Sequence, residues 1–160
     1  MSIQKHLLYM LHLNQEVTRK LVDDINEEES MARGPGRHNH IRWQVGHLLY
    51  SLNYTKTLLG DQESDYSSFE KLYGGGSEVS DDPSAYPSLS ELKEQLYAAH
   101  QAAISLVEGI AEPDLTKEIG EGERKSHVWQ AVTFLCMHEF YHNGQITHIR
   151  KALGRERPFG

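Results

Sequence analysis

Three histidines stand close together in the segment HEFYHNGQITH, residues 138–148, and a glutamate directly follows the first of them. The spacing of His138 and His142 matches the HExxH motif, in which one helix supplies two zinc ligands and the glutamate serves as a base. His148 also stands where the longer HExxHxxGxxH motif has its third ligand. These residues could therefore belong to a metalloprotease or to a different kind of metal site.

Helical geometry argues against the protease. Successive residues of a helix turn by about 100°, so His138 and His142 lie about 40° apart and can reach one ion. His148 is about 240° further round and lies on another face. The protease motif turns the chain at a glycine where this sequence has Gln145, and the glycine comes one residue early, at Gly144. No methionine follows His148, so we also expect no Met-turn.

A third ligand must then come from another helix, and His47 is the best candidate. It lies in the middle of the helical segment WQVGHLLY, where Gly46 allows a neighbouring element to approach closely. Taken alone, such a histidine is more often a satisfied core residue or a partly exposed one. Together with the pair, it predicts that His47, His138 and His142 bind one divalent ion through nitrogens about 2.0–2.2 Å away.

The periodicity of apolar residues predicts the elements that position these histidines. Four helices are expected, over residues 2–25, 40–59, 88–110 and 127–153. Asn39 is the expected cap of the second helix, and a capping box at Ser88 and Glu91 begins the third. Residues 61–87 form a long connection with a short helical turn at SSFEKLY, which lets the second and third helices run parallel. No segment alternates like a strand. The predicted fold is all-α, a four-helix bundle forming one domain over residues 1–160.

Composition narrows the functional classes. A formal net charge of −7 and a pI near 5.8 argue against nucleic-acid binding, and the basic residues Arg150, Lys151, Arg155 and Arg157 suit a solvated helix end. The single cysteine, Cys136, is expected to be a buried, inert thiol, and the lack of any possible intrachain disulfide fits a cytoplasmic protein. No signal peptide and no apolar run long enough to cross a membrane are expected.

The segments NHIRWQVGHLL and HEFYHNGQITHIRKALG, residues 39–49 and 138–154, resemble the DinB/YfiT-like superfamily of metal-dependent bundle proteins. That superfamily pairs a GHL-type histidine on its second helix with an H-x-x-x-H-x-G-Q pattern on its fourth. The resemblance implies a four-helix bundle, a metal site formed by His47, His138 and His142, and a homodimer. It also implies chemistry, because some relatives transfer low-molecular-weight thiols such as bacillithiol or mycothiol, while others look like hydrolases.

Three neutral imidazoles would leave the charge of a divalent ion uncompensated and one coordination position open. Water or a small-molecule thiol could be activated there, so a thiol S-transferase acting on a small-molecule substrate is the leading hypothesis. The alternatives are a metal-dependent hydrolase and a non-catalytic, stress-related metal-binding protein. Imidazoles suit several metals, of which we favour zinc and leave nickel open.

Two groups of side chains near this site remain to be assigned. Glu139 follows a ligand directly and could orient a water or act as a base, the alternative being a solvated or interface carboxylate. Trp43 and Tyr54 could line a pocket or pack in the core. No role is predicted for the remaining histidines of the chain outside the 138–148 segment, His6, His12, His38, His40, His100 and His127.

Overall fold

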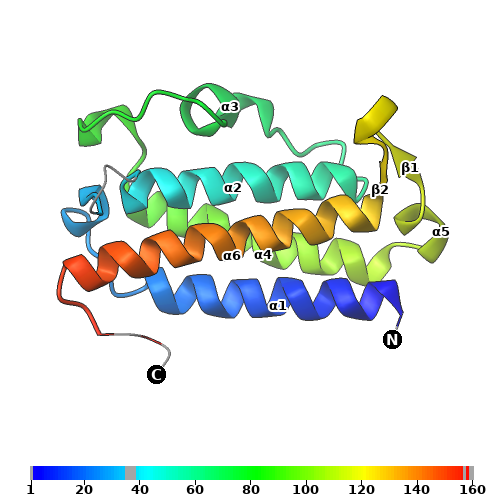
Figure 1. Ribbon diagram of the computed structural model, residues 1–160, viewed down its shortest axis with the longest axis horizontal. Helices are drawn as coiled ribbons and strands as arrows, with labels where there is room; N and C mark the ends of the chain where they lie inside the picture. The colour runs from blue at the N-terminus through cyan, green and yellow to red at the C-terminus, as the bar shows by residue number, and fades with distance from the viewer. Residues whose placement is uncertain (1, 35–38, 157, 159–160) are drawn as a thin grey trace.

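Four long helices form a bundle in the computed structural model, which describes residues 2–34, 39–156 and 158 (Figure 1). The helices are α1 (Ile3–Val22), α2 (Ile41–Leu58), α4 (Leu89–Gly109) and α6 (Val128–Ala152). Each of α2 and α1 packs against both α4 and α6. The predicted all-α four-helix bundle is confirmed.

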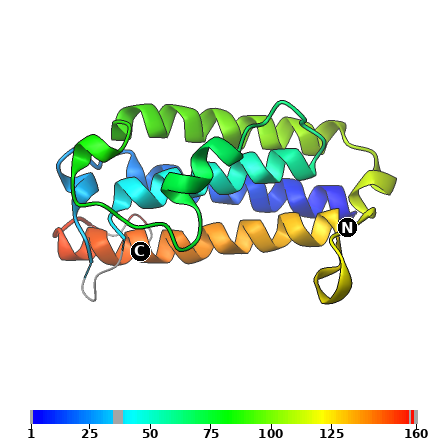
Figure 2. The same cartoon turned by 90° about the horizontal axis from the view of Figure 1, so that it is seen from above.

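The long connection between α2 and α4 lets these two helices run in the same direction, as expected (Figures 1 and 2). Within it, the predicted helical turn at SSFEKLY is the helix α3 (Ser67–Tyr73), and a 3₁₀ turn follows at Pro83–Ala85. Helix α3 packs against α2. The connection therefore covers one side of the bundle instead of hanging free.

Local signals explain where the helices begin and end. Ser2 caps α1, and the capping box of Ser88 and Glu91 begins α4. Gly60 and Gly154 follow α2 and α6 with φ of 101° and 73°, a conformation that glycine adopts without a steric cost.

The expected cap of α2 is wrong by one residue. His40, and not Asn39, precedes the helix, and its Nδ1 accepts a hydrogen bond from the backbone N–H of Trp43 at 3.0 Å. An imidazole nitrogen can fill the role of a side-chain oxygen at this position when it is unprotonated.

The link between α4 and α6 also differs from expectation, because it contains a small hairpin. After the one-turn helix α5 (Glu112–Leu115), strand β1 (Glu118–Ile119) pairs antiparallel with β2 (Ser126–His127), and a 3₁₀ turn (Gly122–Arg124) lies between them. Strands of two residues are too short to show the alternation by which a strand is recognised. A further 3₁₀ turn (Glu29–Met31) follows α1.

The core is built from leucine, isoleucine and valine side chains of all four long helices. One basic residue expected to be solvated is instead buried. Arg150 is only 4% exposed, donates to the Leu21 carbonyl at 2.7 Å and pairs with Asp24, so it ties the end of α6 to the end of α1. Arg157 lies outside the described residues. No helix in the described part of the chain is long and apolar enough to span a bilayer.

Candidate metal centre

The structure brings His47 of α2 and His138 and His142 of α6 together. The Nε2 atom of His138 lies 3.3 Å from Nε2 of His47 and 3.1 Å from Nε2 of His142. One nitrogen from each ring can be chosen so that all three lie within 4.8 Å of one another. His47 and His142 are buried, and His138 is partly exposed.

Hydrogen bonds to the Nδ1 atoms of His47 and His142 leave the Nε2 atom of each ring facing the other histidines. His47 Nδ1 lies 2.6 Å from the backbone oxygen of Tyr73 in α3. A carbonyl oxygen only accepts, so Nδ1 carries the proton and Nε2 presents its lone pair inward. His142 Nδ1 lies 3.2 Å from Oε1 of Gln44, whose amide nitrogen donates to the Asn39 carbonyl at 2.9 Å. That bond orients the Gln44 oxygen toward His142, so the His142 lone pair also faces inward.

Burial keeps these rings neutral. It lowers the pKa of His47 despite the hydrogen bond to Tyr73, and it lowers the pKa of His138, with a further contribution from His47. Burial, and then the proximity of His47 and His138, lowers the pKa of His142 to about 3. Neutral imidazole is the form that binds metals, so the rings need not release protons first at neutral pH.

Helix α3 reaches His47 because of Gly46. A Cβ atom on Gly46 would lie 2.1 Å from the ring of Tyr73, which therefore rests directly on the glycine backbone. This contact places the Tyr73 carbonyl beside His47. On the same side, the Trp43 ring stacks on the His47 ring with centroids 4.8 Å apart and planes 10° from parallel. Trp43 Nε1 donates to the Leu72 carbonyl at 3.0 Å, which also ties α3 to α2.

This arrangement fits a metal ion. A tetrahedral ion with ligand distances of about 2.0–2.1 Å holds its nitrogens roughly 3.3 Å apart, close to the two Nε2 separations observed. Three inward lone pairs repel one another unless a cation or protons lie between them. Among the residues that the structure describes, no fourth histidine, cysteine, aspartate or glutamate joins the group. Three protein ligands and one open position are typical of catalytic metal sites.

Comparison with known proteins identifies the family to which the chain belongs. The sequence profile of the DinB superfamily matches residues 10–146, most of the chain. The chain belongs to the DinB superfamily. Among solved structures, YfiT from Bacillus subtilis is similar with a TM-score of 0.66, at 14% sequence identity over 96% of this chain and 89% of YfiT. YfiT is described as a probable metal-dependent hydrolase with an unusual four-helix bundle topology. No curated protein matches the chain.

In this DinB-superfamily protein, the Glu139 carboxylate is bonded to side chains of α1 and α4. It accepts hydrogen bonds from Thr18 Oγ1 at 2.5 Å, from Asn14 Nδ2 at 3.0 Å and from His100 Nε2 at 2.9 Å. Burial alone would raise the pKa of Glu139, but His100 and the hydrogen bonds from Thr18 and Asn14 together lower it, so the carboxylate stays ionised. The residue is 4% exposed, so it is not the solvated carboxylate considered as an alternative.

Three histidines that received no role from the sequence have defined contacts. His100 is fully buried and bonds Glu139, and His40 caps α2 while its Nε2 lies 3.0 Å from the Ser80 carbonyl. His127 Nδ1 lies 2.6 Å from the Thr116 carbonyl beside the start of α6. Nothing in the local sequence marks the contacts with Glu139, Ser80 and Thr116, because these partners are 39, 40 and 11 residues away in the chain. His38 lies outside the described residues.

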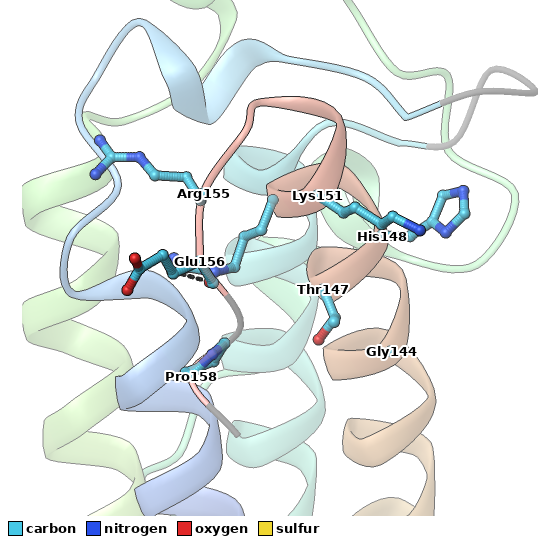
Figure 3. Close-up of a pocket in the computed structure, with 8 residues that line it drawn as sticks. Gly144, Thr147, His148, Lys151, Arg155, Glu156 and Pro158 are labelled. Atoms are coloured by element: carbon cyan, nitrogen blue, oxygen red, sulfur yellow. Dashed lines mark hydrogen bonds between the residues drawn. The ribbon is translucent and has the colours of Figure 1, made fainter. Parts of the chain in front are cut away.

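His148 lies away from the three clustered histidines. It is exposed and lines a separate surface pocket near the end of α6, together with Gly144, Thr147 and Lys151 (Figure 3). Cys136 is buried, and burial raises the pKa of its thiol to about 12, so it is a poor nucleophile as expected. The structure thus separates His148 and Cys136 from the candidate metal centre.

The two residues that bond the Nδ1 atoms of the histidines, Gln44 and Tyr73, were not predicted from the sequence. Gln44 lies three residues before His47, a spacing that places both on one helix face, so a search for polar residues on that face would have found it. Tyr73 contributes a backbone oxygen, which any residue has, and no sequence signal could have identified it.

Proposed function

We propose that the protein is a metal-dependent enzyme in which His47, His138 and His142 hold one divalent ion, and that it transfers a low-molecular-weight thiol to an electrophilic small molecule. The observation that carries the metal site is the convergence of three inward-facing imidazole nitrogens, two of them fixed by hydrogen bonds on the far side of the ring. Zinc is the proposed ion, and nickel is the alternative.

The ligand count supports an enzyme over a purely structural or sensing site. Structural zinc sites are normally closed by four protein ligands, whereas three histidines leave a position for a reactant. His138 is the most accessible of the three rings, so reactants would arrive on its side.

When bound, a divalent ion would supply Lewis-acid chemistry, lowering the pKa of a thiol or a water that coordinates it. The chain orients the rings through Tyr73 and Gln44, and the Trp43 ring covers one face of His47. The Glu139 carboxylate accepts hydrogen bonds from Thr18 and His100. Because it is held by these partners, it is not positioned to act as a base at the candidate metal centre.

Because Glu139 is not placed to act as a base, a thiol is favoured over water as the nucleophile. An ordinary thiol has a pKa near 8.5, far below that of water, so it ionises without a strong base. In the conjugation, sulfur forms a bond to the electrophilic carbon, and the thiol proton ends on the adduct or leaves with the displaced group. Cys136 is unsuited to supply this sulfur, since it is buried with a raised pKa, so the thiol would come from solution.

Hydrolysis is the second candidate, and similarity to YfiT favours it. The two reactions differ in the nucleophile and in their need for a base. A hydrolase would have to use Glu139 in a rearranged state, or a base brought by the substrate.

A panel assay separates the candidates. Purified protein loaded with zinc or with nickel, and a chelated control, would be mixed with cysteine, glutathione, bacillithiol or mycothiol and an aryl halide or epoxide. Ester and amide hydrolysis would be followed in parallel. We expect metal-dependent adduct formation that is lost in His142→Ala. Metal-dependent hydrolysis without any thiol adduct, abolished by Glu139→Gln, would replace the transferase by the hydrolase.

A further inference from the structure

A groove between α2 and α6 includes Phe134, which stands one helical turn before His138 on α6. It encloses about 350 Å³ and is lined by Tyr54, Ser126, Gln130, Ala131, Phe134 and Leu135. None of these six described residues carries a charge. Phe134 is 66% exposed and Tyr54 is 37% exposed. Large aromatic side chains left this open on a hollowed surface commonly mark a binding site.

Aromatic rings connect the groove to the candidate metal centre on both helices. On α6, the Phe134 ring packs nearly parallel to the His138 ring, with centroids 6.4 Å apart. On the other side, Tyr54 contacts Tyr66 at 5.1 Å, Tyr66 contacts Tyr50 at 6.0 Å, and Tyr50 lies 6.1 Å from His47. Phe134 thus belongs both to the wall of the groove and to the surroundings of His138, so a molecule in the groove would lie beside that ring.

The geometry points to this groove as the binding site for an uncharged aromatic or short aliphatic part of the substrate, whose polar reacting group lies at the three histidines. The inference rests on the proposed metal-dependent function and adds the substrate class to it. A charged group would lose hydration in the groove without gaining a counter-charge. A cavity of about 150 Å³ holds one benzene ring, so this volume accommodates an aryl group with a short linker or a medium-length acyl chain.

Hydroxamates test the inference without requiring turnover, because their head group chelates zinc while their tail can be varied. Acetohydroxamate, benzohydroxamate and phenylacetohydroxamate would be titrated into zinc-loaded full-length protein by calorimetry, after zinc content has been measured. Because burying a phenyl ring removes a large apolar area from water, we expect the aryl compounds to bind about tenfold more tightly than acetohydroxamate, or better.

Two variants test whether the preference for aryl hydroxamates arises in the groove. Ala131→Trp fills the groove and Phe134→Ala removes its largest wall. We expect both to reduce the aryl preference, which is the ratio of aryl to acetohydroxamate affinity within each variant, to about twofold or less. This ratio corrects for any change that loss of the Phe134 ring causes at His138. Tyr9→Ala is the matched control, because Tyr9 is an aromatic residue of α1 that is 63% exposed and lies outside the groove. It should keep the full preference.

The outcomes are distinguishable. Equal binding of all three hydroxamates to the wild type, or an aryl preference that survives in both variants, would overturn the groove assignment while leaving the metal site intact. Failure of the wild type to bind either zinc or nickel, or of acetohydroxamate to bind the metal-loaded protein, would overturn the proposed function and this inference with it. If Phe134→Ala instead dissociates a dimer in light scattering without changing the preference, the groove is an interface between copies.

Discussion

The hydrogen bonds behind the imidazoles determine how firmly each ring is held. His47 and His142 each have a partner on Nδ1, the Tyr73 carbonyl and the Gln44 side chain. His138 Nδ1 is buried and has no hydrogen-bond partner among the described residues. Such partners fix the tautomer and orientation of a ligand and raise its basicity.

Substituting Gln44 tests whether the hydrogen bond to His142 Nδ1 contributes to metal binding. We expect Gln44→Leu to weaken zinc affinity about 10- to 100-fold, because His142 loses the acceptor that keeps its proton on Nδ1. Competition with a chromophoric chelator measures the change. Gln95→Leu, at an exposed position of α4, should leave zinc affinity unaltered. Equal affinities for both variants would contradict the tautomer argument.

Histidine substitutions test the ligand set itself. His138→Ala should lose stoichiometric zinc, measured by elemental analysis after gel filtration, because the remaining pair cannot satisfy the ion. His148→Ala should retain full zinc content, since His148 lies in a separate surface pocket at the end of α6. A comparable loss in both variants would mean that α6 bends to bring His148 to the metal.

At the scale of elements, α3 contributes to the candidate metal centre. Its last residue, Tyr73, provides the His47 hydrogen bond, and its ring fits only because position 46 is a glycine. The position of α3 on α2 therefore depends on the absence of a side chain at Gly46.

We expect Gly46→Ala to push Tyr73 and α3 away from α2, because the added Cβ would meet the ring at 2.1 Å. Overpacking of this kind costs about 1–3 kcal/mol of unfolding free energy, and zinc affinity should fall with it. Urea denaturation and chelator competition give the two readouts.

The control for this substitution is Gly144→Ala. A Cβ atom there would meet nothing within 4 Å, and alanine in a helix is favoured over glycine by about 0.5–1 kcal/mol. It should therefore be neutral or stabilising. A Gly46→Ala protein as stable as the wild type, with unchanged zinc affinity, would show that α3 does not hold His47.

At the scale of the whole molecule, a buried polar cluster joins three of the four long helices. Glu139 of α6 accepts hydrogen bonds from Thr18 of α1 and His100 of α4, and Asn143 donates to Thr18 at 2.9 Å. Removing one member leaves the others buried and unpaired, which is costly.

Glu139→Ala should accordingly destabilise the protein by about 3–5 kcal/mol, because the partners of a buried carboxylate lose their acceptor. Glu139→Gln keeps one acceptor oxygen and should cost less. Both variants should still bind zinc wherever they remain folded. Wild-type stability of Glu139→Ala, combined with complete loss of turnover, would instead favour the predicted role as a base.

The overall stability should also depend on pH through His40. This ring is fully buried at the start of α2, and its two nitrogens bond the Trp43 N–H and the Ser80 carbonyl. Both contacts require the neutral ring with its proton on Nε2, because Nδ1 must accept. Protonation of Nδ1 would abolish the cap.

Burial lowers the pKa of His40 from 6.5 to about 4. The Ser80 hydrogen bond and Asp81 act in the opposite direction, Arg33 and Arg42 add to the lowering, and the ring meets Tyr86 edge-on. Between about pH 6.5 and 4, His40 is therefore protonated in the unfolded chain but neutral in the folded protein. Stability contributed by His40 is full above that window and falls as the pH drops through it.

His40→Asn isolates this effect, because asparagine can cap a helix and does not titrate. Between pH 7 and pH 5, the wild type should lose about 2 kcal/mol more unfolding free energy than the variant. Urea titrations at both pH values measure the difference. An identical pH dependence would show that His40 is not held neutral.

Much of this molecule follows from its sequence because it depends on neighbours along the chain. Apolar periodicity, the capping box at Ser88 and the glycines after α2 and α6 act within a few residues, so they predicted the bundle and its long connection. The four-residue spacing of His138 and His142 likewise places both rings on one face of any helix, which made the pair recognisable.

Apart from the predicted meeting of His47 with His138 and His142, tertiary structure decided which distant segments contact one another. The direction of the Glu139 carboxylate depends on which helices lie beside α6, and its partners are 39, 121 and 125 residues away along the chain. The contact of α3 with Gly46 and the groove between α2 and α6 likewise arise only when the helices pack. The pattern of a sequence records which face of a helix is apolar, but which side chains meet across the interface depends on the packing of whole helices.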